Sequence, residues 1–284
     1  MQKDFCLGSQ WLYYKIYTGV KTADYILLEK LNSIILDLEN RDLIQRWFFI
    51  RYKDRNEHIR IRFLVKNTNN LFIVIQSFYP VFNNLLEEKL VWNIQTDTYK
   101  REIERYGKAT MIESEFLFWQ NSKMIVEYLE LKSSFSTQEA PLLFSFYSID
   151  ALFDLFQLSN TDKLSLITQL QISYSKEFEV AKEQKKEMDR KYRLLIPKMK
   201  SLLSKDGKND FYEIISIVDN TSNQVRETIL SIKNKMEISL HLFLSSHIHM
   251  MINRQYTSKQ RMYELIIYDH LYRYYKALYY QKKI

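Results

Sequence analysis

The sequence predicts an α+β fold, in which an antiparallel sheet with helices over residues 1–110 is followed by a mostly helical layer over residues 111–284. Alternation of polar and apolar residues with period two, which is typical of strands, is confined to the first hundred residues. Apolar residues recur at helical spacing through the rest of the chain. Only 4 Gly and 3 Pro occur, which leaves little room for flexible linkers. We therefore expect one domain.

The first half divides at its turn residues. Residues 11–17 are expected to form a strand that ends at Thr18-Gly19, and residues 22–39 an amphipathic helix with Thr22 as its N-cap. A hairpin is expected over residues 44–66, a turn over 67–70, a helix over 71–86 around Pro80, and a further strand over 89–98. Together these elements make a small sheet layer covered by helices.

The second half is expected to be helical over residues 112–131, 141–157, 161–203, 221–253 and 258–281. Pro197 should end or kink the third helix, and a loop is expected at residues 206–210. Opposite charges recur at helical spacing over residues 176–193, which is typical of a solvated helix face. The tyrosine-rich segment 263–280 is expected to pack in the core with its hydroxyls reaching solvent.

The hairpin carries charge where a plain core strand would avoid it. After a turn at residues 53–57, polar and apolar residues alternate strictly from His58 to Phe63. Period two places His58, Arg60 and Arg62 on one face of that strand. An ordinary antiparallel strand with a solvated basic face would show the same pattern, so the arginines alone do not decide between the two interpretations.

Two more polar clusters follow, Tyr-Lys-Arg-Glu-Ile-Glu-Arg-Tyr-Gly at residues 99–107 and Ser-His-Ile-His-Met-Met-Ile-Asn-Arg at residues 246–254. Arginine presents a rigid fork suited to carboxylates, and histidine can exchange a proton near neutral pH. In a helix, Ser245, His249 and Asn253 would share one face, with His247 on another. A lone histidine on an apolar helix is more often a hydrogen-bonded core residue than a catalyst.

Composition excludes several function classes. The formal net charge is +7, but the basic residues are interleaved with 34 acidic ones and no nucleic-acid module is present, so we do not expect direct tRNA contact. A single Cys6 excludes an internal disulfide and offers no zinc site. The N-terminus lacks a signal-peptide pattern, and no apolar run approaches the ~20 residues that span a bilayer. We expect the protein to work in the cytosol.

Taken together, these stretches resemble the small glutamate-eliminating domain of class I lanthipeptide dehydratases and its free-standing relatives in thiopeptide biosynthesis. The resemblance begins at Trp-Leu-Tyr-Tyr-Lys-Ile-Tyr-Thr-Gly over residues 11–19 and runs through both halves of the hairpin. It continues through residues 99–107 with Glu115-Phe116 and closes on His249-Met250-x-x-Asn253-Arg254. The order and spacing of these motifs are specific, although no single motif is. One departure is Lys108, where the family often has a second glycine.

The resemblance implies β-elimination of glutamate from a glutamylated Ser or Thr of a precursor peptide, which leaves dehydroalanine or dehydrobutyrine and needs no cofactor or metal. Carried over by position, it implies that Arg62 and Arg105 grip the glutamyl carboxylate and the developing negative charge. It assigns an orienting role to Arg60 and Glu102, and a proton transfer to His249. Arg101 and Arg254 could equally be structural, paired with nearby acids.

The resemblance also implies a partner, because 284 residues hold an elimination-type domain and no room for a glutamylating one. A separate tRNA-dependent glutamylating subunit is expected to esterify the precursor peptide. Two alternatives stay open: a thiopeptide pyridine synthase that joins two dehydroalanines and expels the leader peptide, and a scaffold that holds a modified peptide without catalysis. Relatives of the pyridine synthase type have lost much of the arginine set, and this chain keeps it, which favours elimination.

Overall fold

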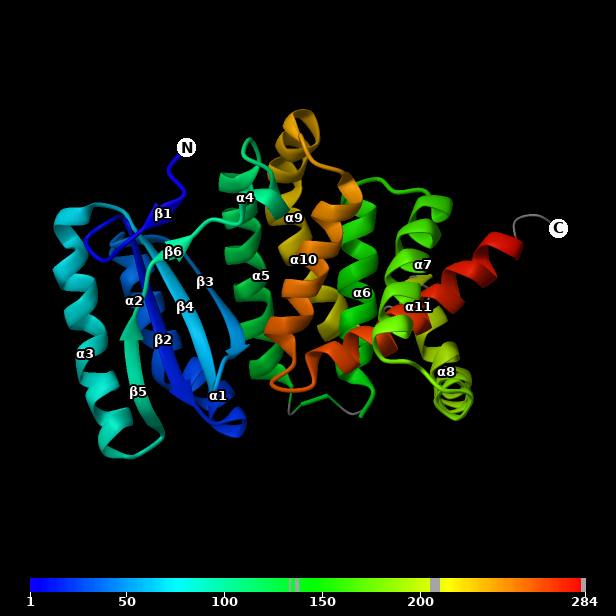
Figure 1. Cartoon of the computed structure of the whole chain (residues 1–284), viewed down its shortest axis with the longest axis horizontal. Coiled ribbons are helices and arrows are strands. Elements are labelled where there is room, and N and C mark those ends of the chain that lie inside the picture. Colours follow the sequence, from blue (N-terminus) through cyan, green and yellow to red (C-terminus); the bar gives the residue numbers. More distant parts are fainter. Residues whose placement is uncertain (133, 136–137, 205–209, 282–284) are drawn as a thin grey trace.

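The protein is described by a computed structural model that covers residues 1–132, 134–135, 138–204 and 210–281. Its main sheet has four antiparallel strands in the order β3-β4-β2-β5, namely β2 (Trp11–Thr18), β3 (Ile44–Lys53), β4 (Glu57–Val65) and β5 (Val91–Thr96). The predicted α+β fold is confirmed, with the sheet in the N-terminal part and helices in the C-terminal half (Figure 1).

Helices α1 (Val20–Tyr25), α2 (Asn32–Asn40) and α3 (Leu71–Glu87) belong to the sheet layer, and the π-helical turn η1 (Ile26–Leu31) joins the first two. A helix over residues 22–39 was expected to begin at an N-cap Thr22, and this detail was wrong. The helix begins at Val20, and Gly19 occupies the N-cap position with extended backbone and no side-chain cap. Pro80 lies inside α3 as expected.

Two very short strands, β1 (Asp4–Phe5) and β6 (Tyr99–Lys100), pair with each other outside the main sheet. They were not predicted, because a two-residue strand has no period and its partner lies far away in the sequence. The turn expected at residues 67–70 contains the 3₁₀ turn η2 (Thr68–Asn70). The four-residue helix α4 (Ile103–Tyr106) then leads into the helical layer.

The helical layer consists of α5 (Met111–Leu131), α6 (Ala140–Leu155), α7 (Asn160–Glu177), α8 (Lys182–Leu203), α9 (Tyr212–Lys235), α10 (Leu240–Gln255) and α11 (Gln260–Gln281). One helix over residues 161–203 was wrong, because the chain breaks at Glu179, which adopts a φ of 47°. One helix over 221–253 was also wrong, because Ser239 starts α10 by accepting a hydrogen bond from the Leu242 N–H.

Helix α8 continues through Pro197 rather than ending there. Leu195, Met199 and Leu202 are buried around the proline, so apolar packing on both sides outweighs the one hydrogen bond that proline removes. Of the loop expected at residues 206–210, positions 206–209 lie outside the described residues. Tyr268, Tyr274 and Tyr275 in α11 are buried, as the packing interpretation of the tyrosine-rich segment predicted. The expectation that the hydroxyls reach solvent was wrong for Tyr268 and Tyr275, whose hydroxyls donate to the buried carboxylates of Glu264 and Asp150.

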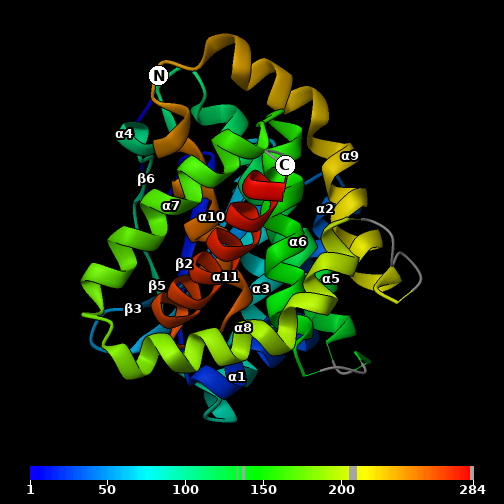
Figure 2. The same ribbon diagram turned by 90° about the vertical axis from the view of Figure 1, so that its right-hand side faces the viewer.

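The two layers meet at β3, against which α5 and α10 pack (Figure 1). Helices α7, α8 and α11 lie at the far end of the molecule from the sheet (Figure 1) and face the viewer in Figure 2. Among the helices described, none combines the length and apolar character that a membrane span requires.

Candidate active site

A cavity of about 40 Å³ lies between the sheet and the helical layer. Strands β3 and β4 supply one wall, the segment from β6 to α4 supplies another, and α5 and α10 close it. The lining residues are Phe48, Ile50, Arg62, Tyr99, Lys100, Glu102, Tyr106, Met111, Phe118, Met250 and Arg254.

Arg62 is a buried cation in this cavity. It lies on β4 between its cross-strand neighbours Tyr13 and Phe48, whose ring centroids are 4.2 and 5.2 Å from its guanidinium carbon. The residue is only 8% exposed, and its Nε and Nη1 atoms have no hydrogen-bond partner among the residues that the structure describes. Burial lowers the pKa of Arg62 from its ordinary value. A buried guanidinium with unused donors is costly and calls for an anionic or polar acceptor.

Arg60 and His58 lie on the same face of β4 as Arg62, as period two predicted, and this face is not the solvated surface of the plain-strand alternative. His58 is 3% exposed and receives a hydrogen bond from Arg60 Nε at its Nε2 atom, at 3.0 Å. The Arg60 guanidinium stacks on Tyr52, 3.4 Å from the ring centroid. These contacts fix the direction of Arg60.

Tyr99 is held beside Arg62 by a buried ion pair. Glu115 on α5 accepts hydrogen bonds from Arg101 at 2.6 and 2.7 Å and from the Tyr99 hydroxyl at 2.9 Å. Glu115 is 1% exposed and Arg101 7% exposed. Arg101 is therefore structural, one of the two roles expected for it, and it anchors β6 to α5.

Glu102 and Arg105 lie at the rim. Glu102 lines the cavity, while Arg105 pairs with it at 3.1 Å and does not line the cavity. Both side chains are more than half exposed. Gly107, which follows, has a φ of 76°, and a Cβ there would approach Thr110 Oγ1 to 2.7 Å. This turn therefore requires one glycine, and Lys108 is compatible with it.

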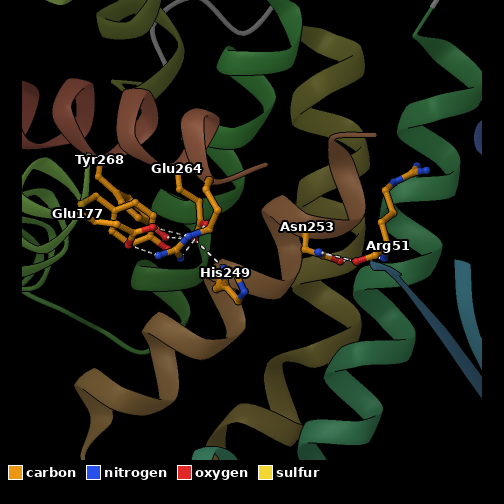
Figure 3. Close-up of polar contacts among 8 residues, drawn as sticks. Arg51, Glu177, His249, Asn253, Glu264 and Tyr268 are labelled. Atoms are coloured by element: carbon orange, nitrogen blue, oxygen red, sulfur yellow. Dashed lines mark hydrogen bonds and ion pairs between the residues drawn. The ribbon is translucent and has the colours of Figure 1, made fainter. Parts of the chain in front are cut away.

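The Asn253-Arg254 pair joins α10 to the sheet. The Asn253 amide accepts from the Arg51 N–H at 2.9 Å and donates to the Arg51 carbonyl at 2.8 Å (Figure 3). Arg254 is 2% exposed and donates through Nε to the Phe49 carbonyl at 2.7 Å and through Nη1 to Asn121 Oδ1 at 2.9 Å. These bonds satisfy backbone groups on the free edge of β3, and they bring Arg254 into the cavity.

His249 lies on a different face of α10 from Arg254. Its Nδ1 atom is 2.9 Å from Oε1 of Glu264, a fully buried carboxylate on α11 that also accepts from the Tyr268 hydroxyl at 3.0 Å (Figure 3). The histidine side chain is 29% exposed. A buried carboxylate on one ring nitrogen fixes the orientation of a histidine and leaves its other nitrogen available for proton transfer.

His247, two residues earlier in α10, points into an aromatic cluster of Tyr106, Phe118 and Phe243. Burial, together with the charge of Arg254, lowers the pKa of His247 to about 3. The ring is therefore neutral at physiological pH, and its direction away from His249 agrees with the helical prediction.

The structure brings two of the five predicted site residues, Arg62 and Glu102, to one cavity. Arg60, Arg105 and His249 do not line it. Two residues of the region were not predicted as site residues: Arg254, considered for a structural role, and Glu264, which stands in no motif. Both act through contacts between distant segments, for which the sequence carries no local signal. Among the described residues, no three His, Cys, Asp or Glu side chains gather closely enough to hold a metal ion.

Comparison with known proteins gives a family match over nearly the whole chain. A family model described as the C-terminal region of the lantibiotic biosynthesis dehydratase matches residues 11–275. The nisin biosynthesis protein NisB of Lactococcus lactis subsp. lactis is 31% identical over 124 residues, which are 43% of this chain. The chain spans only a small part of that relative, because the matched stretch is 12% of NisB.

Two solved structures share the fold. MibB from Microbispora sp. 107891, a tRNA-dependent lantibiotic dehydratase, matches 99% of this chain and 29% of its own, with a TM-score of 0.77 and 19% identity. TbtD, a pyridine synthase from thiomuracin biosynthesis, matches 95% of this chain and 100% of its own, with a TM-score of 0.56 and 11% identity. At these identities the likeness is one of fold alone.

Proposed function

The chain belongs to the lantibiotic biosynthesis dehydratase C-terminal family, and on that premise we propose that it is a lyase that eliminates glutamate from glutamylated Ser and Thr residues of a precursor peptide. It would act as one subunit of a split dehydratase. A separate subunit would use glutamyl-tRNA to esterify the peptide, and the reaction would take place in the cytosol, where both substrates are made.

The elimination involves three bond changes. A base takes the Cα proton of the esterified residue, the electron pair forms the Cα=Cβ bond, and the Cβ–O bond breaks so that glutamate departs as a carboxylate. Negative charge develops on the peptide carbonyl and on the leaving group. Fixed cations that face this charge in a site without bulk water stabilise the transition state.

The main support for this proposal is the environment of Arg62. Its guanidinium is buried at the junction of the layers, is oriented by Tyr13 and Phe48, and has donors without a partner. A cation held in this way is suited to an anion that arrives with the substrate, because the cost of burying it is offset only when that anion binds. We assign to Arg62 the developing negative charge of the elimination.

Of the remaining proposed residues, only Glu102 lines this cavity. Arg105 is linked to the cavity through its ion pair with Glu102, and His249 is adjacent in sequence to the lining residue Met250. A peptide with a glutamyl ester is much larger than the cavity, so contacts around its mouth are expected. We propose that Arg105 binds the glutamyl carboxylate, that Arg60 and Glu102 orient the arginines, and that His249, positioned by Glu264, transfers a proton.

Substitution tests these roles. Purified Arg62→Ala, Arg105→Ala and His249→Ala proteins are incubated with the precursor peptide, the glutamylating enzyme, glutamate, tRNA, its synthetase and ATP. Each variant should accumulate glutamate adducts, visible by mass spectrometry, with elimination slowed on the order of 10²-fold or more. Arg226→Ala, at an exposed arginine on α9, is the matched control and should dehydrate the peptide at the wild-type rate.

Circular dichroism and thermal unfolding confirm that each variant is folded. A folded variant that eliminates at nearly the wild-type rate removes that residue from the site. A wild-type protein that leaves glutamylated peptide unchanged but cyclises a peptide with two dehydroalanines would replace elimination by the pyridine synthase reaction.

A further inference from the structure

Arg254 is a second buried cation of the same cavity, and the residues assigned above do not include it. It is 2% exposed, and the two hydrogen bonds that hold it go to neutral acceptors, the Phe49 carbonyl and the Asn121 side-chain oxygen. Among the residues that the structure describes, no carboxylate forms an ion pair with Arg254. Burial lowers the pKa of Arg254 to about 10, and the charge of Arg62 adds to this effect.

Two like charges in one buried cavity are expensive without a counter-ion. Glu102 is the acidic residue that lines the cavity. Its side chain is 57% exposed and already forms an ion pair with Arg105 at 3.1 Å. Other buried arginines in this protein have acids: Arg101 pairs with Glu115 at 2.6 Å and Arg51 with Asp24 at 2.5 Å. The Arg62–Arg254 cavity therefore differs from the structural ion pairs of the same fold.

We propose that Arg254 is an anion-binding residue that, together with Arg62, holds one carboxylate of the leaving glutamate. This inference rests on the elimination function proposed above, and it names a carboxylate as the group that the Arg62 cavity binds. Guanidinium groups match a carboxylate through paired hydrogen bonds. The Phe49 and Asn121 contacts aim the Arg254 fork, so the structural bonds and the binding role belong to the same side chain.

The size of the cavity agrees with this ligand. Its volume of about 40 Å³ exceeds the roughly 10–15 Å³ that a cavity needs to hold one water. A carboxylate head group fits such a space, whereas the rest of a glutamate must lie outside it. A small dicarboxylate is therefore a sufficient probe, and it reports on the cavity without any elimination taking place.

The experiment measures binding of glutarate to the full chain by calorimetry, with glutaramide as the uncharged comparison. Glutarate should bind and glutaramide should not. A charge-assisted hydrogen bond contributes about 1.5–3 kcal/mol, so Arg254→Met and Arg62→Met should each weaken glutarate binding by roughly 10- to 100-fold. Arg254→Lys keeps the charge but lacks the guanidinium fork, so it should lose less glutarate affinity than Arg254→Met. It replaces the Met variant in the test if that variant does not fold.

Two controls separate binding from packing. Asn121→Ala removes one hydrogen bond that aims Arg254 but keeps both charges and the Phe49 contact, so it should weaken glutarate binding less than Arg254→Met does. In a double-mutant cycle, Arg62→Met and Arg254→Met should be strongly non-additive, because either change already removes half of a shared site. Additive losses, wild-type affinity in folded Arg254→Met or Arg254→Lys, or equal binding of glutaramide would each overturn the proposal.

Failure of this proposal differs from failure of the proposed function. If the protein eliminates glutamate while glutarate does not bind, or while Arg254→Met keeps wild-type affinity and kcat/KM, the assignment of Arg254 is wrong and the lyase stands. If glutarate binds as described but no glutamate is eliminated from glutamylated peptide, the anion site stands and the lyase does not.

Discussion

Three side chains at the junction of the layers, Arg62, Arg254 and His247, could each carry a positive charge while buried. The two arginines keep their charge near neutral pH, and His247 does not, because burial holds its pKa near 3. The neutral ring packs against Tyr106 and Phe118, which line the cavity. A protonated His247 would add a third positive charge beside two arginines that form no ion pair with any described carboxylate.

This arrangement predicts acid sensitivity at one residue. His247 binds a proton with a pKa near 6.5 in the unfolded chain and about 3 in the folded protein, so the unfolded state gains protons first as pH falls. The stability that His247 contributes is complete above pH 6.5 and declines toward pH 3. Between pH 7 and pH 5 the linkage lowers the free energy of unfolding by about 2 kcal/mol.

Denaturant unfolding of wild type and His247→Phe at pH 7 and pH 5 checks this. The variant should gain about 2 kcal/mol relative to wild type over that interval, since it has no imidazole to protonate. The difference between the two proteins should stay constant from pH 7 to pH 8. A difference that is also constant from pH 7 to pH 5 would show that His247 is not a buried neutral histidine.

At this scale the sequence predicted residue types and faces, and it could not predict partners. Alternation placed Arg60 and Arg62 on one face because strand geometry is local. Whether Arg62 has an ion-pair partner depends on α5 and α10, which come from far along the chain, and among the described residues it has none. The same reason explains why Arg254 was left between two roles and why Glu264 was not considered.

At the scale of elements, α10 is attached to the sheet by a side chain that imitates a strand. Asn253 provides one acceptor and one donor to the outward-facing N–H and carbonyl of Arg51 on the edge strand β3. Asn253 thereby covers the free edge of the sheet next to the position at which Arg254 enters the cavity. The contacts of Asn253 and Arg254 with β3 thus explain why the motif at the end of α10 contains these two residues. The ion pair with Glu264 explains the position of His249.

Loss of this contact should destabilise the protein. In Asn253→Ala the Arg51 N–H and carbonyl lose their partners, which costs on the order of 1–3 kcal/mol in the free energy of unfolding. Urea unfolding measures this, with Asn223→Ala on the exposed part of α9 as the matched control, expected within about 0.5 kcal/mol of wild type. Equal stability of the two variants would mean that the Asn253 contact does not hold α10 to β3.

Elements with a local signal were predicted and breaks without one were not. The hairpin and the strand at residues 11–17 follow from period two and turn residues, and α5, α6 and α11 follow from helical spacing. The breaks after α7 and α9 carry neither Gly nor Pro. The first depends on Glu179 adopting a conformation that favours glycine, and the second on Ser239 as an N-cap, a weak signal within a long helical pattern.

For the whole molecule, the decisive fact is the length of its relatives. The chain corresponds to 12% of NisB over the matched stretch and to 29% of MibB. The described residues that line the proposed cavity offer cations for a leaving anion, and the formation of the ester is assigned, as part of the proposed function, to a separate subunit. The dependence on a partner is therefore part of the proposed function.

The most direct test supplies the purified wild-type protein with two forms of one precursor peptide, unmodified and already glutamylated, without tRNA or a glutamylating enzyme. The glutamylated form should lose glutamate and become dehydrated, as seen by mass spectrometry, while the unmodified form should be unchanged. Folded Arg62→Met serves as the matched control and should leave the glutamate adduct in place. A glutamylated peptide that survives incubation with folded wild-type protein would show that this protein does not eliminate glutamate.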